Sequence, residues 1–226
     1  MIWLFLFLLL AGALLFWELR ISEGAHLGRR FVVWLYNLAA KRYDRIKKFD
    51  FAWENRILGE PITDVLMGLE DALLLDMGAG TGRLSRTLLP LLNFKGTVIN
   101  LEPSKKMLNL GRDLTNSDRA PWLRGYAVPL PFDEGTFDLV ASLEVLEFTP
   151  HPKETLQELV RVLLPGGWMI ITNRVGWEAK WILGRTHPRD RFGSFLEEAG
   201  LENISVYPWQ VDYDLAWARK PFANVR

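Results

Sequence analysis

Hydrophobic and polar residues follow two different patterns along this chain of 226 residues. Ile2 to Trp17 form an unbroken run of apolar residues and small Ala and Gly, whereas from about residue 71 short apolar runs alternate with stretches of helical periodicity. The short runs predict buried strands, and the periodic stretches predict amphipathic helices. Strands that alternate with helices are typical of a mostly parallel sheet with helices on both faces.

The expected elements fill the chain from residue 71 almost to its end. Strands are predicted at 72–77, 97–101, 122–127, 137–142, 168–173, 204–207 and 213–218, and helices at 82–91, 104–112, 153–163 and 192–199. Gly200 directly follows the last helix, where a glycine commonly ends a helix. Only residues 208–212 join the last two strands, a hairpin-like connection, so one strand of this pair is expected to be antiparallel in the seven-stranded sheet.

The N-terminal apolar run predicts a membrane anchor over residues 1–20. As a helix at ~1.5 Å per residue it is about 24 Å long, short against a hydrocarbon core of ~30 Å. Trp3 and Trp17 stand at its two ends, where aromatic belts lie. A cleaved signal peptide would need a basic start and a small-residue cleavage site, and a buried core helix would need polar spacing. The sequence has none of these features.

Charge is balanced over the whole chain but uneven along it. There are 27 Lys and Arg against 27 Asp and Glu, which gives no support to a nucleic-acid partner. From Glu18 to Lys48, eight basic residues stand against three acidic ones. This excess predicts contact with an anionic membrane surface, and its place after the anchor predicts a single-pass protein with a cytoplasmic domain. Phe31 to Ala40 is too short to span a membrane; it either lies in the headgroup plane or packs on the domain.

The remaining composition excludes several classes of site. The chain has no cysteine, and His26, His151 and His187 lack the spacing of metal ligands, so neither a disulfide nor a metal site is expected. Tyr43 and Lys47 have the spacing of a short-chain dehydrogenase pair but precede the glycine loop. We interpret residues 21–60 as a basic juxtamembrane and helical lid segment, and 61–226 as the α/β domain.

The most specific chemical signal is a glycine loop that follows the first strand of the domain. Asp76 ends a buried run, and the glycines that follow let the backbone turn tightly and approach a ligand. Glu102, at the end of the next strand, is placed to accept hydrogen bonds from ribose hydroxyls. The dinucleotide fingerprint requires a small residue where Arg83 stands, and Asp76 would repel a pyrophosphate. An ammonium or sulfonium ligand suits this loop better.

Residues 71–173 resemble class I S-adenosylmethionine-dependent methyltransferases of the small-molecule type that includes quinone methyltransferases. The resemblance lies in D76-M-G-A-G-T-G82, in V98-I-N-L-E102-P-S, in 125–132, in 137–147 and in 161–167. It implies a Rossmann-like fold and S-adenosyl-L-methionine as cofactor, with no metal. The cofactor-binding residues that it implies are Asp76, Gly78, Ala79, Gly80 and Gly82 at the methionine end, Glu102 and Pro103 at the ribose, Met107, Tyr126 and Ala127 at the adenine, and Glu144 at the active-site lip.

Two positions depart from the family pattern. Tyr126 stands where an Asp often contacts the adenine amine, which leaves recognition to the Ala127 backbone or to stacking by Tyr126. Phe148 stands where many members carry a histidine, which removes the most obvious general base. The catalytic residue is therefore unknown at this stage, and the candidates, unranked, are Glu144, Glu147, Tyr43 and His187.

The methyl acceptor is not fixed by the sequence: lipid amines, quinols and small soluble molecules all remain open. The segment after the fifth strand carries Trp177 and Trp181, which either pack in the core or form an aromatic substrate lip that faces a bilayer. Two other functions stay open. One is a catalytically inactive, membrane-tethered module that binds the cofactor, and the other is an NAD(P)-dependent oxidoreductase.

Overall fold

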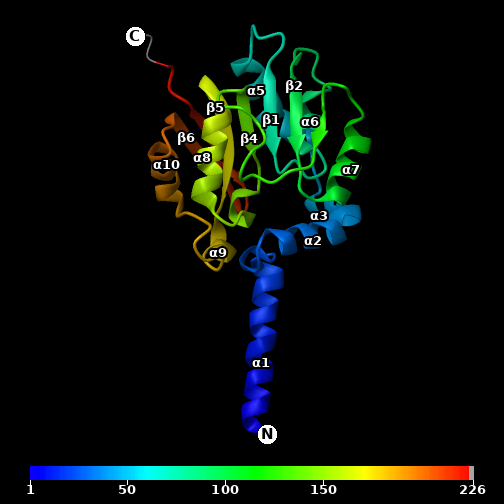
Figure 1. The fold of residues 1–226 in the computed structure, drawn as a ribbon, viewed down its shortest axis with the longest axis vertical. Coiled ribbons are helices and arrows are strands. Elements are labelled where there is room, and N and C mark those ends of the chain that lie inside the picture. The colour runs from blue at the N-terminus through cyan, green and yellow to red at the C-terminus, as the bar shows by residue number, and fades with distance from the viewer. Residues whose placement is uncertain (224–226) are drawn as a thin grey trace.

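The computed structural model describes residues 1–223, which form an α/β domain on a single projecting helix (Figure 1). Seven strands form one sheet in the order β3-β2-β1-β4-β5-β7-β6. β1 pairs in parallel with β2 and β4, whereas β7 runs antiparallel to both β5 and β6. The predicted sheet of seven strands with a reversed last strand is confirmed. The strands are β1 (Leu73–Met77), β2 (Thr97–Leu101), β3 (Trp122–Leu123), β4 (Phe137–Ser142), β5 (Leu163–Arg174), β6 (Glu202–Gln210) and β7 (Tyr213–Arg219).

Helices and short helical turns connect and cover these strands. Those before the sheet are α1 (Ile2–Phe16), η1 (Trp17–Ile21), η2 (Ala25–Leu27), α2 (Arg29–Ala39), η3 (Ala40–Arg42), α3 (Tyr43–Lys47), α4 (Phe51–Glu54), η4 (Asn55–Gly59) and α5 (Glu60–Val65). Those within it are α6 (Arg83–Leu88), α7 (Lys105–Thr115), η5 (Leu146–Phe148), α8 (Pro152–Val162), α9 (Gly176–Ala179) and α10 (Arg189–Glu198).

The sheet is buried on both faces because successive strand residues point to opposite sides. Leu75 of β1 packs with α8 and α10 in one apolar cluster, whereas its neighbour Leu74 packs with α5 and α6 in a second cluster. Both leucines are fully buried. The continuous apolar runs of the central strands are explained by this double cover, which is typical of parallel sheets.

The N-terminal helix stands apart from the domain. No side chain of α1 is buried, and the helix continues through η1, so that residues Ile2–Ile21 form a 20-residue apolar helix long enough to cross a membrane. The helix therefore continues four residues past the apolar run that ends at Trp17, and it nearly coincides with the anchor predicted over residues 1–20. Trp17 lies at the junction: its indole Nε1 donates to the Trp181 carbonyl at 2.9 Å and its ring stacks on His26.

Several boundaries differ from the predicted ones for local reasons. The helix expected over 82–91 begins at Arg83, because Gly82 adopts a left-handed conformation (φ +83°), and it ends two residues before Pro90. The strand expected over 122–127 is reduced to two residues at the edge of the sheet. Gly200 follows the last helix with φ +90°, as predicted.

Candidate functional site

A cavity of about 450 Å³ lies where the parallel strands end, within the ~300–1,000 Å³ typical of small-molecule sites. Its walls come from four parts of the chain: α2 and the start of α3, the glycine loop after β1, the end of β2, and the segments after β3 and β4. Seven of the residues expected at the cofactor line it: Gly78, Gly80, Glu102, Pro103, Tyr126, Ala127 and Glu144. The topology thus brings together residues that are up to 66 positions apart in sequence.

The glycine loop has a left-handed backbone at Gly78 and Gly80, and at the first of these there is also no room for a side chain. Gly78 has φ +77°, and a Cβ built on it would lie 2.4 Å from a methyl carbon of Val145. Gly80 has φ +57°, and a Cβ there would lie 3.6 Å from the ring of Tyr43, so the backbone passes directly beneath that ring. Both positions need glycine, since a left-handed backbone and close approach are costly for other residues.

Glu102 is fixed at the wall of the cavity by backbone hydrogen bonds. Its Oε2 accepts from the Gly80 N–H at 2.9 Å, and its Oε1 accepts from the Ser104 N–H at 2.8 Å. Burial, with a contribution from Asp76, outweighs these hydrogen bonds and raises the pKa of Glu102 to about 7. Each carboxylate oxygen has a further acceptor site, so both remain available to a diol.

Asp76 and Ala79 lie beside the main cavity rather than on its wall. Both line a small cavity of about 20 Å³, which shares Tyr43, Gly78 and Glu144 with the larger one. Burial raises the pKa of the Asp76 carboxyl to about 7, although the charge of Arg83 partly offsets it. A cation bound in the main cavity would stabilise the ionised form of this carboxyl.

Part of the lining of the cavity is apolar. Leu101, Pro103, Tyr126 and Ala127 belong to this part, and the guanidinium of Arg29 packs on the Tyr126 ring at 4.5 Å from the centroid. Arg29 also donates to the Val128 carbonyl at 3.4 Å. The first residue of α2 thus connects this helix to the segment after β3.

Two of the expected residues do not reach either cavity. Met107 belongs to α7, whose N-terminus is capped by Ser104, and its side chain is fully buried. Gly82 is the N-cap residue before α6, and a Cβ there would lie 3.0 Å from Trp122, so the backbone packs closely against β3 at this position.

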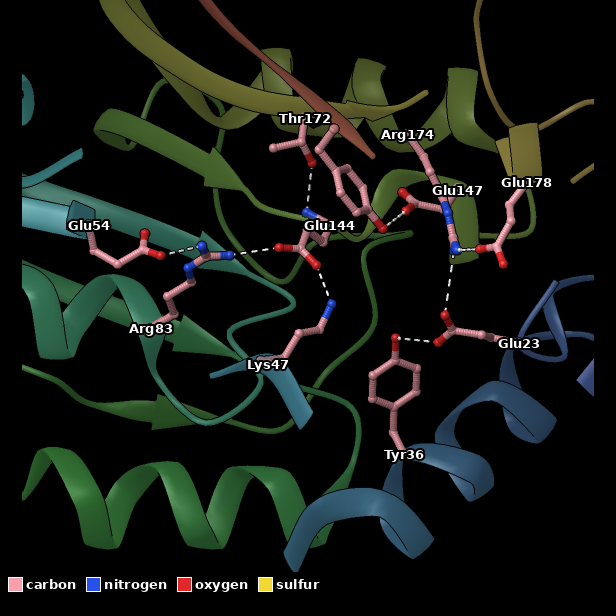
Figure 2. A network of polar contacts seen from close by, with 11 residues as sticks. Glu23, Tyr36, Lys47, Glu54, Arg83, Glu144, Glu147, Thr172, Arg174 and Glu178 are labelled. Atoms are coloured by element: carbon pink, nitrogen blue, oxygen red, sulfur yellow. Dashed lines mark hydrogen bonds and ion pairs between the residues drawn. The ribbon is translucent and has the colours of Figure 1, made fainter. Parts of the chain in front are cut away.

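A buried ion network lies under the glycine loop and fixes Glu144 (Figure 2). Arg83 donates to Glu144 at 2.7 Å and to Glu54, and Lys47 donates to the other oxygen of Glu144. Burial alone would raise the pKa of Glu144, but Lys47 and Arg83 together lower it below the usual value. Glu144 has φ +59°, a conformation rare for this residue type, and its N–H donates to Thr172. An ionised, doubly paired carboxylate is a poor general base.

The other candidate bases are less well placed. Glu147 is buried, does not line the cavity, and accepts from the Tyr213 hydroxyl; burial raises its pKa to about 7. His187 stacks on Phe195 away from the cavity, and burial lowers its pKa. Tyr43 lines the cavity, but burial and nearby carboxylates raise its pKa well above 10.0.

The sequence did not indicate that α2 and His151 would line the cavity. Val32, Val33 and Tyr36 of α2 line the cavity, and the Tyr36 hydroxyl donates to Glu23 at 3.3 Å, while Glu23 also contacts Arg174 (Figure 2). His151 lines the same cavity three residues after Phe148. The amphipathic pattern of residues 29–40 was a signal for α2, whereas nothing in the spacing singled out His151.

Comparisons with known proteins agree with this geometry. The family described as Methyltransferase domain matches residues 75–171. A ubiquinone/menaquinone biosynthesis C-methyltransferase from Roseobacter denitrificans is 30% identical over 155 residues, 67% of this chain and 61% of that protein. A demethylmenaquinone methyltransferase from Clavibacter sepedonicus is 30% identical over 61% of this chain and 55% of that protein. The chain thus spans less than two thirds of the length of either relative.

The fold also resembles that of a solved methyltransferase structure. The crystal structure of a SAM dependent methyltransferase from Aquifex aeolicus superposes with a TM-score of 0.62 at 19% identity, covering 81% of this chain and 97% of that one. The fold is therefore the Rossmann-like methyltransferase fold, and the domain match and the relatives support an S-adenosylmethionine-dependent methyltransferase.

Proposed function

We propose that this protein is a membrane-anchored methyltransferase that transfers the methyl group of S-adenosylmethionine to a lipophilic acceptor. One observation carries the proposal: a single cavity at the carboxyl edge of the sheet joins the bare glycine backbone, the Glu102 carboxylate and an apolar part of the lining. These three features correspond to the methionine chain, ribose and adenine of that cofactor.

The charges around the cavity fit this cofactor better than a dinucleotide. Asp76 and Glu144 lie beneath the loop, and the nearby cations Arg83 and Lys47 are already paired with carboxylates. A pyrophosphate at this loop would face acidic groups, whereas a sulfonium and an ammonium would be attracted by them. The nicotinamide alternative is therefore disfavoured.

The acceptor is proposed to be apolar because of the wall opposite the glycine loop. Val32, Val33, Phe148 and Pro150 form this wall, together with the ring of Tyr36. One relative is named as a ubiquinone/menaquinone biosynthesis C-methyltransferase and the other as a demethylmenaquinone methyltransferase, and a quinol-type ring with an isoprenoid tail has the matching chemistry. We propose that the acceptor is a flat, apolar molecule that is dissolved in the bilayer.

The cofactor supplies an activated methyl group, so the protein has to bind both partners, align them and exclude water. His151 is proposed as the general base. His151 is an exposed residue among those that line the cavity, and its imidazole has no hydrogen-bond partner among residues 1–223. It would accept the acceptor proton as the nucleophile attacks the methyl carbon, while the sulfur retains the electron pair of the broken bond. His151 would thus act in place of the histidine that many family members carry where Phe148 stands.

The anchor is proposed to be the helix Ile2–Ile21, with the domain in the cytoplasm. All side chains from Met1 to Phe16 are exposed, so α1 packs against nothing in the described residues. Exposing that many apolar residues to water would be costly, and a bilayer removes the cost. The basic residues that follow it support the orientation.

Labelled methyl groups test the acceptor. Full-length protein in detergent with methyl-labelled cofactor is incubated either with a total lipid extract or with the aqueous metabolite pool. We expect label in a lipid-soluble product. Label only in water-soluble products would contradict a lipophilic acceptor. Binding of the cofactor without any label transfer from either pool would favour the inactive module.

Affinity for the cofactor is expected to rise with pH up to about 7 and then to level off. The ribose hydroxyls and the positive charge favour an ionised Glu102, whose pKa in the free protein is about 7. Its pKa therefore falls in the complex, and affinity is lost as pH falls below 7. At about pH 8, Glu102→Gln should bind roughly tenfold to hundredfold more weakly, the equivalent of about 1.5–3 kcal/mol.

Calorimetric titrations across this pH range measure the effect. Glu70→Gln is the matched control because Glu70 is exposed and precedes β1 at the opposite edge of the sheet. Equal affinities for the Glu102→Gln variant and the unmodified protein at every pH would exclude Glu102 from the ribose site.

A further inference from the structure

The end of the domain from which α1 projects carries a second set of exposed apolar residues. In Figure 1, α2 and α3 lie on one side of the top of α1 and α9 lies on the other. Trp34 and Leu38 of α2 are 51% and 58% exposed, and Trp177 and Trp181 at α9 are 63% and 55% exposed. We use the name docking surface for these side chains together with the exposed Leu27, Ile46 and Leu183.

Hydrogen bonds fix the two sides of this surface to the base of the anchor. Trp17, the residue after α1, donates from Nε1 to the Trp181 carbonyl at 2.9 Å. His26, in the turn before α2, lies 3.3 Å from the Leu183 carbonyl through Nε2 and 3.0 Å from Glu18 in η1 through Nδ1. The docking surface is therefore held at the level where the anchor would leave a bilayer.

Near the base of α1, the acidic side chains are paired within the protein whereas many basic side chains are not, which favours contact with anionic headgroups. The three acidic residues between 18 and 48 all have internal partners: Glu18 binds His26, Glu23 binds Tyr36 and Arg174, and Asp44 binds Thr81 and Arg86. Between residues 18 and 48, Arg20, Arg29, Arg30, Lys41, Arg42, Arg45 and Lys48 are exposed and form no ion pair with residues 1–223, and the same holds for Lys180 beside α9.

We propose that the docking surface lies in the interface of an anionic bilayer and holds the domain there independently of α1. Exposed Trp and Leu among unpaired cations are the composition of interfacial segments. α2 would then lie between lipid and cavity, with Trp34 and Leu38 outward and Val32 and Tyr36 on the cavity wall. The proposal deepens the membrane association proposed above, but its test requires no catalysis.

Vesicle binding by a protein that lacks residues 1–15 tests the proposal. This protein should fold, because no residue before Trp17 is buried or bonded to the domain. We expect it to co-sediment with vesicles of phosphatidylcholine and phosphatidylglycerol, and much less with phosphatidylcholine alone. Lys41→Gln with Arg42→Gln should weaken binding about fivefold per charge, which corresponds to about 1 kcal/mol each.

Apolar substitutions separate this surface from nonspecific adhesion. Trp34→Ser with Leu38→Ser, and Trp177→Ser with Leu183→Ser, should each weaken binding about tenfold or more, since each removes two large apolar side chains from the interface. Met67→Ser with Leu92→Ser is the apolar control and Lys95→Gln the charge control, since these exposed residues precede β1 or β2 at the opposite edge. Circular dichroism and Tm establish that each variant is folded.

Two outcomes would overturn the proposal. The first is a folded protein without residues 1–15 that fails to bind the anionic vesicles, or whose binding is unchanged in all docking-surface variants. The second is a dimer in solution that Trp34→Ser with Leu38→Ser dissociates, without lipid binding, which would assign the surface to a second copy of the chain. Either result would overturn only this proposal, because the proposed cofactor binding and methyl transfer are tested by separate experiments.

Discussion

His151→Gln is expected to lower kcat for methyl transfer about 10²–10⁴-fold, the usual contribution of a general base, while leaving the affinity for S-adenosylmethionine within about twofold of the unmodified protein. The reason is positional. His151 is the histidine on the cavity wall, whereas Glu144 is held ionised between two cations and Glu147 does not reach the cavity. Glutamine keeps the size and polarity of the side chain but does not accept a proton at neutral pH.

Single-turnover rates with a saturating lipid acceptor measure this effect, and calorimetry measures the cofactor affinity. His187→Gln is the matched control: this histidine stacks on Phe195 away from the cavity and should retain full rate. If His151→Gln transfers methyl groups as fast as the unmodified protein, the acceptor needs no base from His151, and that part of the mechanism is wrong.

Arg83→Met is expected to lower the free energy of unfolding by about 3–5 kcal/mol, because it leaves buried carboxylates without their counter-charge. Arg83 is buried, bridges Glu54 and Glu144, and stacks between Phe49 and Trp209 at 4.9 and 4.3 Å. Methionine replaces much of the packing but none of the charge. Lys47 still pairs with Glu144 in this variant, so Glu54 bears most of the loss.

The loss of unfolding free energy in Arg83→Met should increase as the pH rises. Burial raises the pKa of Glu54 in the folded protein above its ordinary value, and Arg83 partly offsets this rise. Without Arg83, the pKa of Glu54 in the folded protein lies further above its value in the unfolded chain. The folded variant then binds a proton more tightly, so its deficit is small near pH 5 and grows as the pH rises to about 8. Denaturant unfolding at both pH values measures this change.

Arg86→Met is the matched control on the same helix. Arg86 forms a partly exposed pair with Asp44 at 2.5 Å, and such pairs contribute at most about 1 kcal/mol. Glu54→Gln combined with Arg83→Met should recover part of the stability, since it removes the unpaired charge. A loss below about 1 kcal/mol for Arg83→Met alone would show that the network is not a stabilising element.

The sequence predicted the sheet because its central strands depend on local signals. The runs that end at Asp76 and Glu102 form mostly buried strands because helices cover both faces of the sheet, and the glycines after Asp76 favour a loop with a left-handed backbone. These signals lie within one or two consecutive elements. The edge strand β3 was predicted too long, because at the edge of a sheet only one neighbour supports pairing.

The cavity wall opposite the glycine loop could not be predicted in the same way. The sequence left open whether residues 31–40 lie in the headgroup plane or pack on the domain, and it did not indicate which face would meet the domain. In the structure, Val32 and Tyr36 of α2 line the cavity, whereas Trp34 and Leu38 are exposed. Arg83 was noted only as a departure from the dinucleotide fingerprint, since its partners Glu54 and Glu144 lie 29 and 61 residues away.

The most direct test of the central claim is the identity of the bound cofactor. Full-length protein in detergent is titrated by calorimetry with S-adenosylmethionine, with S-adenosylhomocysteine and with NAD at about pH 8, above the pKa of about 7 given for Glu102. We predict saturable one-to-one binding of both adenosyl compounds, and NAD binding weaker by about a hundredfold or more. Tight binding of NAD without binding of either adenosyl compound would contradict the assignment of this cavity.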